Sequence, residues 1–380
     1  MSWTVPLTDV VLSEDDVASV LECLGDGWLT MGPRTEALER ALAELLGAEH
    51  AVAVSSGTAA LHLALLAAGV APGDEVLVPA FTFVAGAGVV RHCGARPVFV
   101  EPCGPDDFNL DPDDAARRIG PQTRALLATH WMGYACDLPA LERLCDRHGL
   151  LLIEDCAQSI TAACVDGRLT GTVGAAGCFS FFSKHQLCVG EGGMIITADS
   201  DIAAKARSLR SHAMTSATWE RHTGHADSYD VVDVGFNFRI DEARAALGLS
   251  RLPRLHADIA KRRALVRSYR DQLASIERVT CPWTDEEVDR SAHFGFPIVL
   301  ETPAERDRVA RELTARRIQT TWYPALTTLS AYRDHRPCPR AEGVAARHLG
   351  LPLSCTFTTR EVDHVVSHLT EIVAAKDDNG

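Results

Sequence analysis

The sequence predicts an α/β fold: a large domain on a mostly parallel sheet, followed by a smaller α+β domain. Over the first two-thirds of the 380 residues, short apolar stretches of strand length alternate with stretches of helix length. Such alternation is typical of parallel sheets with helical crossovers. After about Pro253 the pattern changes to a long Arg-rich helix, one strand and further helices. We therefore expect a large domain over residues 15–250 and a small one over 251–380, with residues 1–14 packing across.

The individual elements are predicted from apolar runs and their stop signals. Thr35 is a candidate N-cap for a helix that Gly47 ends, and Pro79 ends a strand. Ser55-Ser56-Gly57-Thr58 opens the helical run ALHLALLAAG. The expected strands are 51–55, 75–78, 97–101, 125–129, 151–154, 178–182 and 194–197, and the expected helices are about 35–46, 59–68, 83–93, 138–149 and 202–211. The small domain is expected to hold the helix HADIAKRRALVRSYRDQLASI, the strand HFGFPIVL, and the helices AERDRVARELTARR and REVDHVVSHLTEIVAAK.

Composition argues against several classes of function. The chain is 46% hydrophobic and 23% charged, and it contains no apolar run of about 18 residues that would span a membrane. The start of the sequence lacks a basic region followed by an apolar core, so we expect a cytoplasmic location. The net charge of −14, with no basic run, argues against nucleic-acid binding.

Two further enzyme classes are disfavoured by missing motifs. The twelve cysteines form no Cys-x-x-Cys pair, and no His/Asp/Glu cluster shows ligand spacing, so we expect no metal site. No Gly-x-Gly-x-x-Gly follows an early strand, which argues against a nicotinamide-dependent enzyme.

Three polar stretches follow predicted strands. Ser56-Gly57-Thr58 stands before a helix, where free N–H groups and the helix dipole suit a phosphate. Asp155 ends another strand next to a second carboxyl residue, and such a pair serves as metal ligand, catalytic base, partner of a ring N–H, or simple helix cap. The third stretch runs from Phe179 to a Gly-rich turn and includes one of only four lysines. A phosphate cup, a carboxylate and a strand-end lysine together indicate pyridoxal phosphate.

At this point the chain resembles the DegT/StrS-type sugar aminotransferases, which have the aspartate-aminotransferase-like fold (fold type I of the pyridoxal phosphate enzymes). The resemblance covers nearly the whole chain and rests on motifs in a fixed order: GWLTMGP (27–33), SGTAALH (56–62), PAFTF (79–83), EDCAQ (154–158), FSF (179–181), GEGG (190–193) and GFNFR (235–239). The segment Trp219–Asp233 resembles the branch from antibiotic pathways, aminoglycoside pathways among them, that make aminosugars or aminocyclitols.

The resemblance implies pyridoxal 5′-phosphate or pyridoxamine 5′-phosphate as cofactor, bound in a homodimer. Gly57, Thr58 and Ser180 would bind the cofactor phosphate. Asn237 would reach the same phosphate from the partner subunit, and the Trp219–Asp233 loop would also come from the partner. Each of these residues has an alternative role in the fold itself, as a cap or a turn residue.

The resemblance also implies the contacts of the cofactor ring. Phe83 would stack on the ring, Asp155 would pair with the pyridine nitrogen and keep it protonated, and Gln158 would touch the hydroxyl side of the ring. The substrate would be a keto sugar or ketocyclitol, with or without a nucleotide, and glutamate or glutamine would supply the amine. For Phe83 the alternative is a residue of the apolar core.

The sequence departs from the family at the residue that should form the Schiff base with the cofactor. Counting Phe179 as one, the family lysine is the seventh residue, and here the seventh is His185, with Lys184 one place early. In the first hypothesis, His185 is an acid/base catalyst, since histidine titrates near neutral pH. A related branch, the nucleotide-sugar 3-dehydratases, has histidine at this position and expels a hydroxyl group.

Two other hypotheses remain open. Lys184 takes over the Schiff base, which requires a local twist because adjacent residues of an extended segment point to opposite sides. Alternatively, transamination is lost, and the chain is a pseudoenzyme that assembles with or regulates a partner, or an ordinary aminotransferase altered at this position. The residues alone do not identify which hypothesis holds.

Overall fold

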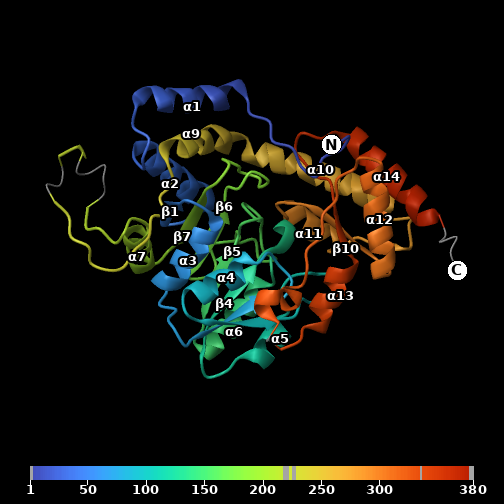
Figure 1. The fold of residues 1–380 in the computed structure, drawn as a ribbon, viewed down its shortest axis with the longest axis horizontal. Helices are drawn as coiled ribbons and strands as arrows, with labels where there is room; N and C mark the ends of the chain where they lie inside the picture. The colour runs from blue at the N-terminus through green and yellow to red at the C-terminus, as the bar shows by residue number, and fades with distance from the viewer. Residues whose placement is uncertain (1–2, 217–221, 225–227, 334–335, 376–380) are drawn as a thin grey trace.

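The structure is a computed structural model of the chain, and it describes residues 3–216, 222–224, 228–333 and 336–375. A seven-stranded sheet with helices around it forms the larger part, and a three-stranded sheet belongs to the C-terminal part (Figure 1). The strands of the large sheet are β1 (His50–Val54), β2 (Glu75–Pro79), β3 (Arg96–Val100), β4 (Thr123–Thr129), β5 (Leu151–Asp155), β6 (Ala176–Ser180) and β7 (Gly193–Thr197). The predicted α/β class is confirmed.

The strand order of the large sheet is β1-β7-β6-β5-β4-β2-β3. Strands β2 to β6 run parallel to one another, whereas β7 runs antiparallel to both of its neighbours, β1 and β6. In this register Asp155 pairs with Cys178, and Ser180 pairs with Gly193. Because parallel strands end at one edge of a sheet, the ends of β5 and β6 lie side by side there.

Helices cover both faces of this sheet. Val76 and Val78 of β2 belong to one apolar cluster with Leu63, whereas Leu77, between them, belongs to another with Leu141. Alternate strand residues point to opposite faces, so the helices that carry Leu63 and Leu141 lie on opposite sides. The helices of this part are α1 (Glu14–Asp26), α2 (Pro33–Leu46), α3 (Gly57–Ala67), α4 (Ala85–His92), α5 (Pro112–Arg118), α6 (Leu138–His148), α7 (Ser200–Arg210) and α9 (Glu242–Arg251).

The C-terminal part contains the antiparallel sheet β10-β9-β8. Its elements are β8 (Val279–Thr280), β9 (Phe296–Leu300), β10 (His348–Leu351), α10 (Leu255–Leu273), α11 (Asp285–Arg290), α12 (Pro303–Ala315), α13 (Pro339–Arg347) and α14 (Thr359–Ala374). The N-terminal segment contacts this part through a bridge between Val5 and Ile318. The domain boundary after residue 250 stays a prediction, because the run from α9 through Leu252–Arg254 to α10 crosses it.

One local prediction is corrected. The helix expected from Thr35 begins at Pro33, with Gly32 as its N-cap residue. Thr35 lies inside the first turn and is buried, and its hydroxyl donates to Oε1 of Glu242 at 2.7 Å. The threonine therefore joins α2 to α9 instead of capping α2. In the described part of the chain, no helix combines the length and the apolar composition needed to cross a membrane.

Candidate active site

A cavity of about 410 Å³ brings together residues from seven stretches of the chain. Eight of the nine residues predicted from the sequence line it: Gly57, Thr58, Phe83, Asp155, Gln158, Ser180, Lys184 and His185. Further lining residues include Thr82, Trp131, Phe182, Glu191, Phe294 and Tyr323. The motifs thus converge on one site, as the sequence predicted, whereas their roles toward a ligand stay predictions.

The end of the cavity at α3 has the form of a phosphate cup. The first N–H groups of a helix have no acceptor within the helix, and the dipole adds positive potential there. A Cβ on Gly57 would lie 2.6 Å from Cβ of Ser180, and a Cβ on Gly193 would lie 2.5 Å from the carbonyl carbon of Ser56. Two glycines therefore allow β6, β7 and the start of α3 to meet. The N–H groups at the start of α3 and the hydroxyls of Thr58 and Ser180 fit a phosphate ester.

The acidic pair at the end of β5 divides into a structural and a cavity-facing residue. Glu154 accepts four hydrogen bonds at 2.7–3.0 Å, from Nε2 of His130 and from the N–H groups of Gly171, Val173 and Gly174. Although burial opposes ionisation, these donors hold the pKa of Glu154 below its usual value. Glu154 therefore anchors the 171–174 turn beneath the sheet edge.

Asp155 has far fewer donors. Its Oδ1 accepts from the N–H of Ala157 at 3.1 Å, and Thr129 Oγ1 donates to Oδ2 at 3.5 Å. Burial raises the pKa of the Asp155 carboxyl above its usual value. A cationic ring N–H in the cavity would supply the partner that favours its ionised form. The donor set of this site therefore fits a pyridine nitrogen opposite Asp155 and a phosphate at α3.

One cluster resembles a metal site in composition. Ligand atoms of His130, Glu154 and Cys156 lie within 4.8 Å of one another. However, Nδ1 of His130 accepts from the N–H of Cys136 at 3.1 Å, so its Nε2 carries the proton that is donated to Glu154. Because the ligand atoms of His130 and Glu154 are already engaged within the protein, the cluster gives no support to a metal site.

His185 lies on a turn and not on an extended segment. Its N–H donates to the carbonyl of Phe182 at 2.8 Å, and its Nδ1 lies 3.1 Å from the carbonyl oxygen of Ser180. A carbonyl oxygen only accepts, so Nδ1 carries the hydrogen and Nε2 keeps its lone pair. Burial lowers the pKa of His185 to about 4, and the charge of Arg262 also lowers it. The imidazole is therefore neutral at pH 7.

Lys184 lines the same cavity as His185, because the turn brings both side chains to its wall. Lys184 also lines a neighbouring cavity of about 60 Å³, which includes Thr8 and Gly295. The local twist that a role for this lysine required is therefore present. Lys184 is the one Lys or Arg among the described residues that line the main cavity.

Several cavity residues were not found by sequence reasoning. Trp131 is buried in the apolar core, and it also lines the cavity and packs edge-on against Tyr323, with ring centroids 4.9 Å apart. Phe294 and Tyr323 come from the C-terminal half and have no motif near them. A search for aromatic residues near the Gly-rich turn would have found Phe182. Phe83, which the sequence did predict, is 56% exposed at the cavity wall and is therefore not a core residue.

Asn237 does not line this cavity. It is exposed and forms an isolated antiparallel bridge with Ser211, while its neighbours Phe236 and Phe238 stack on each other beside His62. The prediction that Asn237 acts from a partner subunit is therefore not tested by one chain. Of the Trp219–Asp233 segment, residues 219–221 and 225–227 lie outside the described residues.

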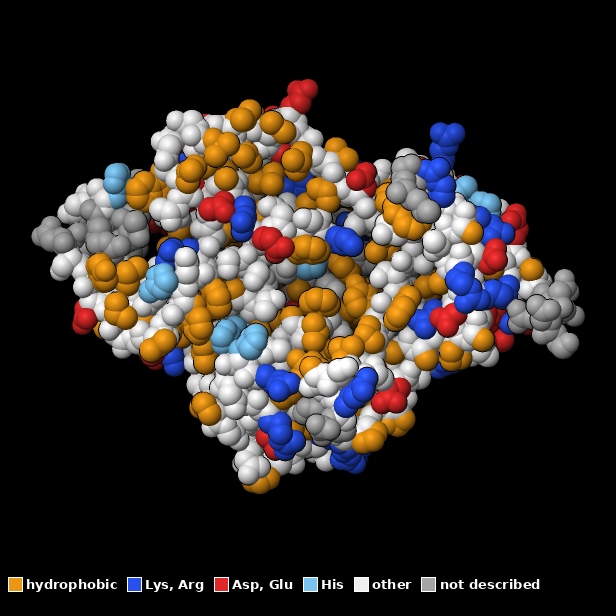
Figure 2. Space-filling view, in the orientation of Figure 1, with side chains coloured by type: hydrophobic (Ala, Val, Ile, Leu, Met, Phe, Trp, Pro, Cys, Tyr) orange, Lys and Arg blue, Asp and Glu red, His pale blue; other side chains and the backbone are white. Residues whose placement is uncertain are grey.

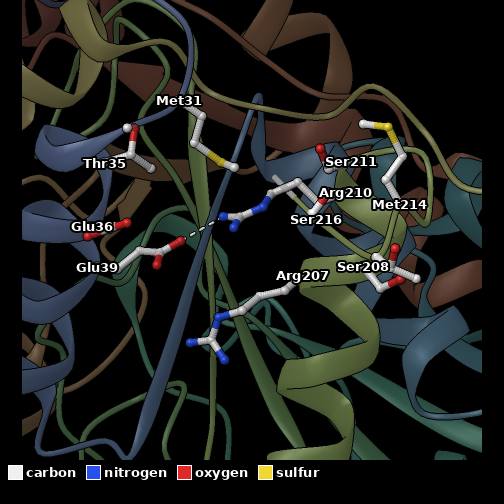
Figure 3. Close-up of a pocket in the computed structure, with 12 residues that line it drawn as sticks. Met31, Thr35, Glu36, Glu39, Arg207, Ser208, Arg210, Ser211, Met214 and Ser216 are labelled. Carbon is white, nitrogen blue, oxygen red and sulfur yellow. Dashed lines mark hydrogen bonds and ion pairs between the residues drawn. The ribbon is translucent and has the colours of Figure 1, made fainter. Parts of the chain in front are cut away.

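A second cavity, of about 500 Å³, lies between α2 and α7. Figure 3 shows Glu39 and Arg210 pointing toward each other across it. Arg210 Nη1 donates to Glu39 and to the carbonyl of Ala53, both at 2.6 Å, and Arg207 donates to the carbonyl of Ala51 at 3.0 Å. Both arginines thus hold α7 against β1. None of the predicted site residues lines this second cavity, so the candidate active site is the cavity of about 410 Å³.

Comparisons with known proteins agree with the site. The chain is 35% identical to GDP-perosamine synthase of Caulobacter vibrioides, over 93% of this chain and 94% of that protein. Among solved structures, S. venezuelae DesV has a TM-score of 0.90 at 33% identity (99% and 100% covered), and the aminotransferase TlmJ of Streptoalloteichus hindustanus has 0.90 at 32% (97% and 99% covered).

The family model described as "DegT/DnrJ/EryC1/StrS aminotransferase family" matches residues 11–370. This match confirms the expected cofactor, because the enzymes of this family depend on pyridoxal 5′-phosphate or its pyridoxamine form. The histidine at position 185 and its consequences are not addressed by the comparisons. The chain belongs to the DegT/DnrJ/EryC1/StrS family of sugar aminotransferases.

Proposed function

We propose that this chain acts on a keto sugar or ketocyclitol with pyridoxal or pyridoxamine phosphate, and that His185 moves the proton that a lysine moves in its relatives. The observation that carries the proposal is the neutral imidazole in the same cavity as Asp155 and the phosphate cup. We place the reaction in aminosugar or antibiotic biosynthesis, on the resemblance of the Trp219–Asp233 segment.

The binding roles that the resemblance implies are supported by the position of these residues around one cavity. Gly57, Thr58 and Ser180 would hold the phosphate of the cofactor, and Asp155 would hold its pyridine nitrogen. Phe83 would stack on the ring, and Gln158 would contact the hydroxyl side; its Oε1 accepts from the N–H of Met132 at 2.8 Å, which fixes the amide. When bound, the cofactor supplies an electron sink for bonds broken beside its nitrogen.

His185 would hold and release a proton at Nε2. The hydrogen bond from Nδ1 to the Ser180 carbonyl fixes the tautomer, so Nε2 is the basic atom. Because the pKa of the imidazole is lowered to about 4, His185 is a weak base that is fully available at pH 7. This chemistry suits dehydration or another reaction that does not require a covalent lysine.

A second candidate function is favoured by the turn that presents Lys184 to the same cavity. In that case Lys184 holds the cofactor covalently and the chain is a transaminase, with glutamate or glutamine as amine donor. A third possibility is an inactive member of the family that binds or regulates a partner. These candidates differ in whether an amine of the chain attaches to the cofactor and in whether substrate is turned over.

The test is to load the purified chain with pyridoxal phosphate, reduce it with borohydride and map any adduct by mass spectrometry. Our proposal expects bound cofactor with no adduct on the chain, and turnover of a keto sugar that His185→Ala abolishes. An adduct on Lys184 that Lys184→Gln removes, with Lys205→Gln as control, supports the second candidate. Cofactor binding without any turnover supports the third, and no cofactor binding contradicts all catalytic candidates.

One relative suggests the substrate, and the exposed apolar surface suggests the assembly. Because one relative is named GDP-perosamine synthase, we propose a nucleotide-linked keto sugar as the first substrate to assay. We also propose a homodimer, because large apolar side chains are exposed on the N-terminal segment and α1, where Figure 2 shows orange side chains gathered at the top. These residues are Val10, Val11, Leu12, Val17, Leu21 and Leu24.

A further inference from the structure

The residue that follows His185 makes buried contacts that the proposed function does not use. The Gln186 side chain is 6% exposed, and its Nε2 donates to the carbonyls of Gln158 at 2.7 Å and Ala292 at 3.1 Å. The reversed amide would set Oε1 against two carbonyl oxygens, so these acceptors fix the orientation of the amide. One side chain therefore joins the His185 turn, the end of β5 and the loop 291–295.

The loop 291–295 is itself tied to the large domain. Ser291 Oγ donates to the carbonyl of Gly133 at 2.9 Å, and the N–H of Phe294 donates to the carbonyl of Met132 at 3.0 Å. A Cβ on Gly133 would lie 2.8 Å from the backbone nitrogen of His293. The close approach of the two backbones leaves the loop little room to shift.

This loop contacts the catalytic imidazole directly. The ring of Phe294 packs edge-on against that of His185, with centroids 5.2 Å apart and planes at 78°. The buried Arg262 also holds this loop, because its Nη1 donates to the carbonyls of His293, Phe294 and Leu353 at 3.3–3.4 Å. The position of the imidazole therefore depends on the loop that Gln186 holds.

We propose that Gln186 is a positioning residue: its amide joins the His185 turn to loop 291–295, so that Phe294 and the Ser180 carbonyl hold the imidazole with Nε2 available in the cavity. The inference rests on the role of His185 in the proposed function. It concerns geometry, however, and is measurable on the chain without cofactor or substrate.

Position 186 requires a side chain in which one atom donates two hydrogen bonds, because two carbonyl oxygens face it. Methionine has a similar length and volume but donates nothing, so two buried carbonyls would lose their donor. A carboxylate would face the same two carbonyl oxygens and repel them. Gln272 offers a matched control, because its Nε2 also donates to two acceptors, Ser268 Oγ and Asp363 Oδ1, on the small domain.

The experiment compares Gln186→Met with Gln272→Met by ¹⁵N NMR of the histidine rings, with His185→Asn used to assign the signal. In the parent and in Gln272→Met we expect one tautomer of His185, protonated at Nδ1. In Gln186→Met we expect an additional form protonated at Nε2. We also expect the affinity for pyridoxamine phosphate to be about tenfold weaker, because a displaced imidazole changes the wall of the cavity in which the cofactor binds.

A Gln186→Met chain that folds and keeps the single Nδ1–H tautomer with unchanged cofactor affinity overturns the proposal. If this variant does not fold, Ser291→Ala loosens the other attachment of the loop, and the same two readouts decide. A mixed tautomer in a chain that turns over no substrate leaves the positioning role standing while the proposed function fails. If Gln186→Met leaves both the tautomer of His185 and the cofactor affinity unchanged in an enzyme that turns over substrate, Gln186 has no positioning role, and the proposed function stands.

Discussion

The neutral state of His185 has a measurable consequence for stability. The ordinary imidazole pKa is 6.5, and burial lowers it to about 4 in the folded chain. The unfolded chain therefore binds this proton more readily than the folded chain does. The stability that the neutral ring allows is fully present above pH 6.5, and it is lost as the pH falls toward 4.

The magnitude follows from the two pKa values. At pH 5 the ring is about 97% protonated in the unfolded chain and about 9% in the folded chain, which gives a loss of about 1.8 kcal/mol between pH 7 and pH 5. At about 0.8 kcal/mol per degree for a chain of 380 residues, the midpoint falls by about 2 °C from this residue alone. His185→Asn keeps an N–H donor for the Ser180 carbonyl and removes the titration.

The assay is urea unfolding at pH 7, 6 and 5 of the parent, of His185→Asn and of His256→Asn, which replaces an exposed histidine on α10. The difference in the free energy of unfolding between parent and variant cancels the contribution of other titrating groups. Asp155 and Asp107 are examples: burial raises their pKa, so their effect on stability has the opposite sign. We expect the parent to lose about 1.8 kcal/mol more than His185→Asn on going to pH 5. Parallel curves would refute a neutral imidazole with a lowered pKa at this site.

Other substitutions test the frame of the site. Glu154→Gln places an amide N–H against buried donors and should lower stability by about 3–5 kcal/mol, or the melting midpoint by about 4–6 °C, as measured by calorimetry. Gly57→Ala should abolish binding of pyridoxal phosphate in an absorbance titration, because its Cβ would lie 2.6 Å from that of Ser180, whereas Gly343→Ala, whose Cβ meets nothing within 4 Å, should not. Asp155→Asn should weaken binding of the protonated ring while the midpoint holds or rises, since a buried carboxyl with a raised pKa is removed; an unchanged affinity would contradict its assigned role.

The sequence predicted the fold and most of the residues that line the cavity, because both depend on local patterns. Strand-length apolar runs and ordered motifs place Asp155 and Ser180 at strand ends and Gly57 at the start of the helix after a strand, and the ends of parallel strands meet at one edge. The acidic pair could not be resolved, because only the fold shows that three backbone N–H groups converge on Glu154.

Contacts between distant segments account for the remaining differences. Phe294 and Tyr323 reach the cavity through packing of the C-terminal part, which no short motif encodes. The turn at Lys184 was also not predictable, because alternation in an extended strand argued against two adjacent side chains on one wall. The hydrogen bond from His185 to Phe182 creates that turn.

The contact between Gly193 and Ser56 limits how this chain can diverge. A methyl group on that glycine would sit 2.5 Å from backbone atoms, which cannot swing aside as a side chain does. Substitution of this glycine is thus blocked by steric overlap, even in a descendant that no longer carries out any reaction. A descendant that replaces residue 185 and changes its chemistry should therefore still keep Gly57 and Gly193, because their close contacts do not depend on the reaction.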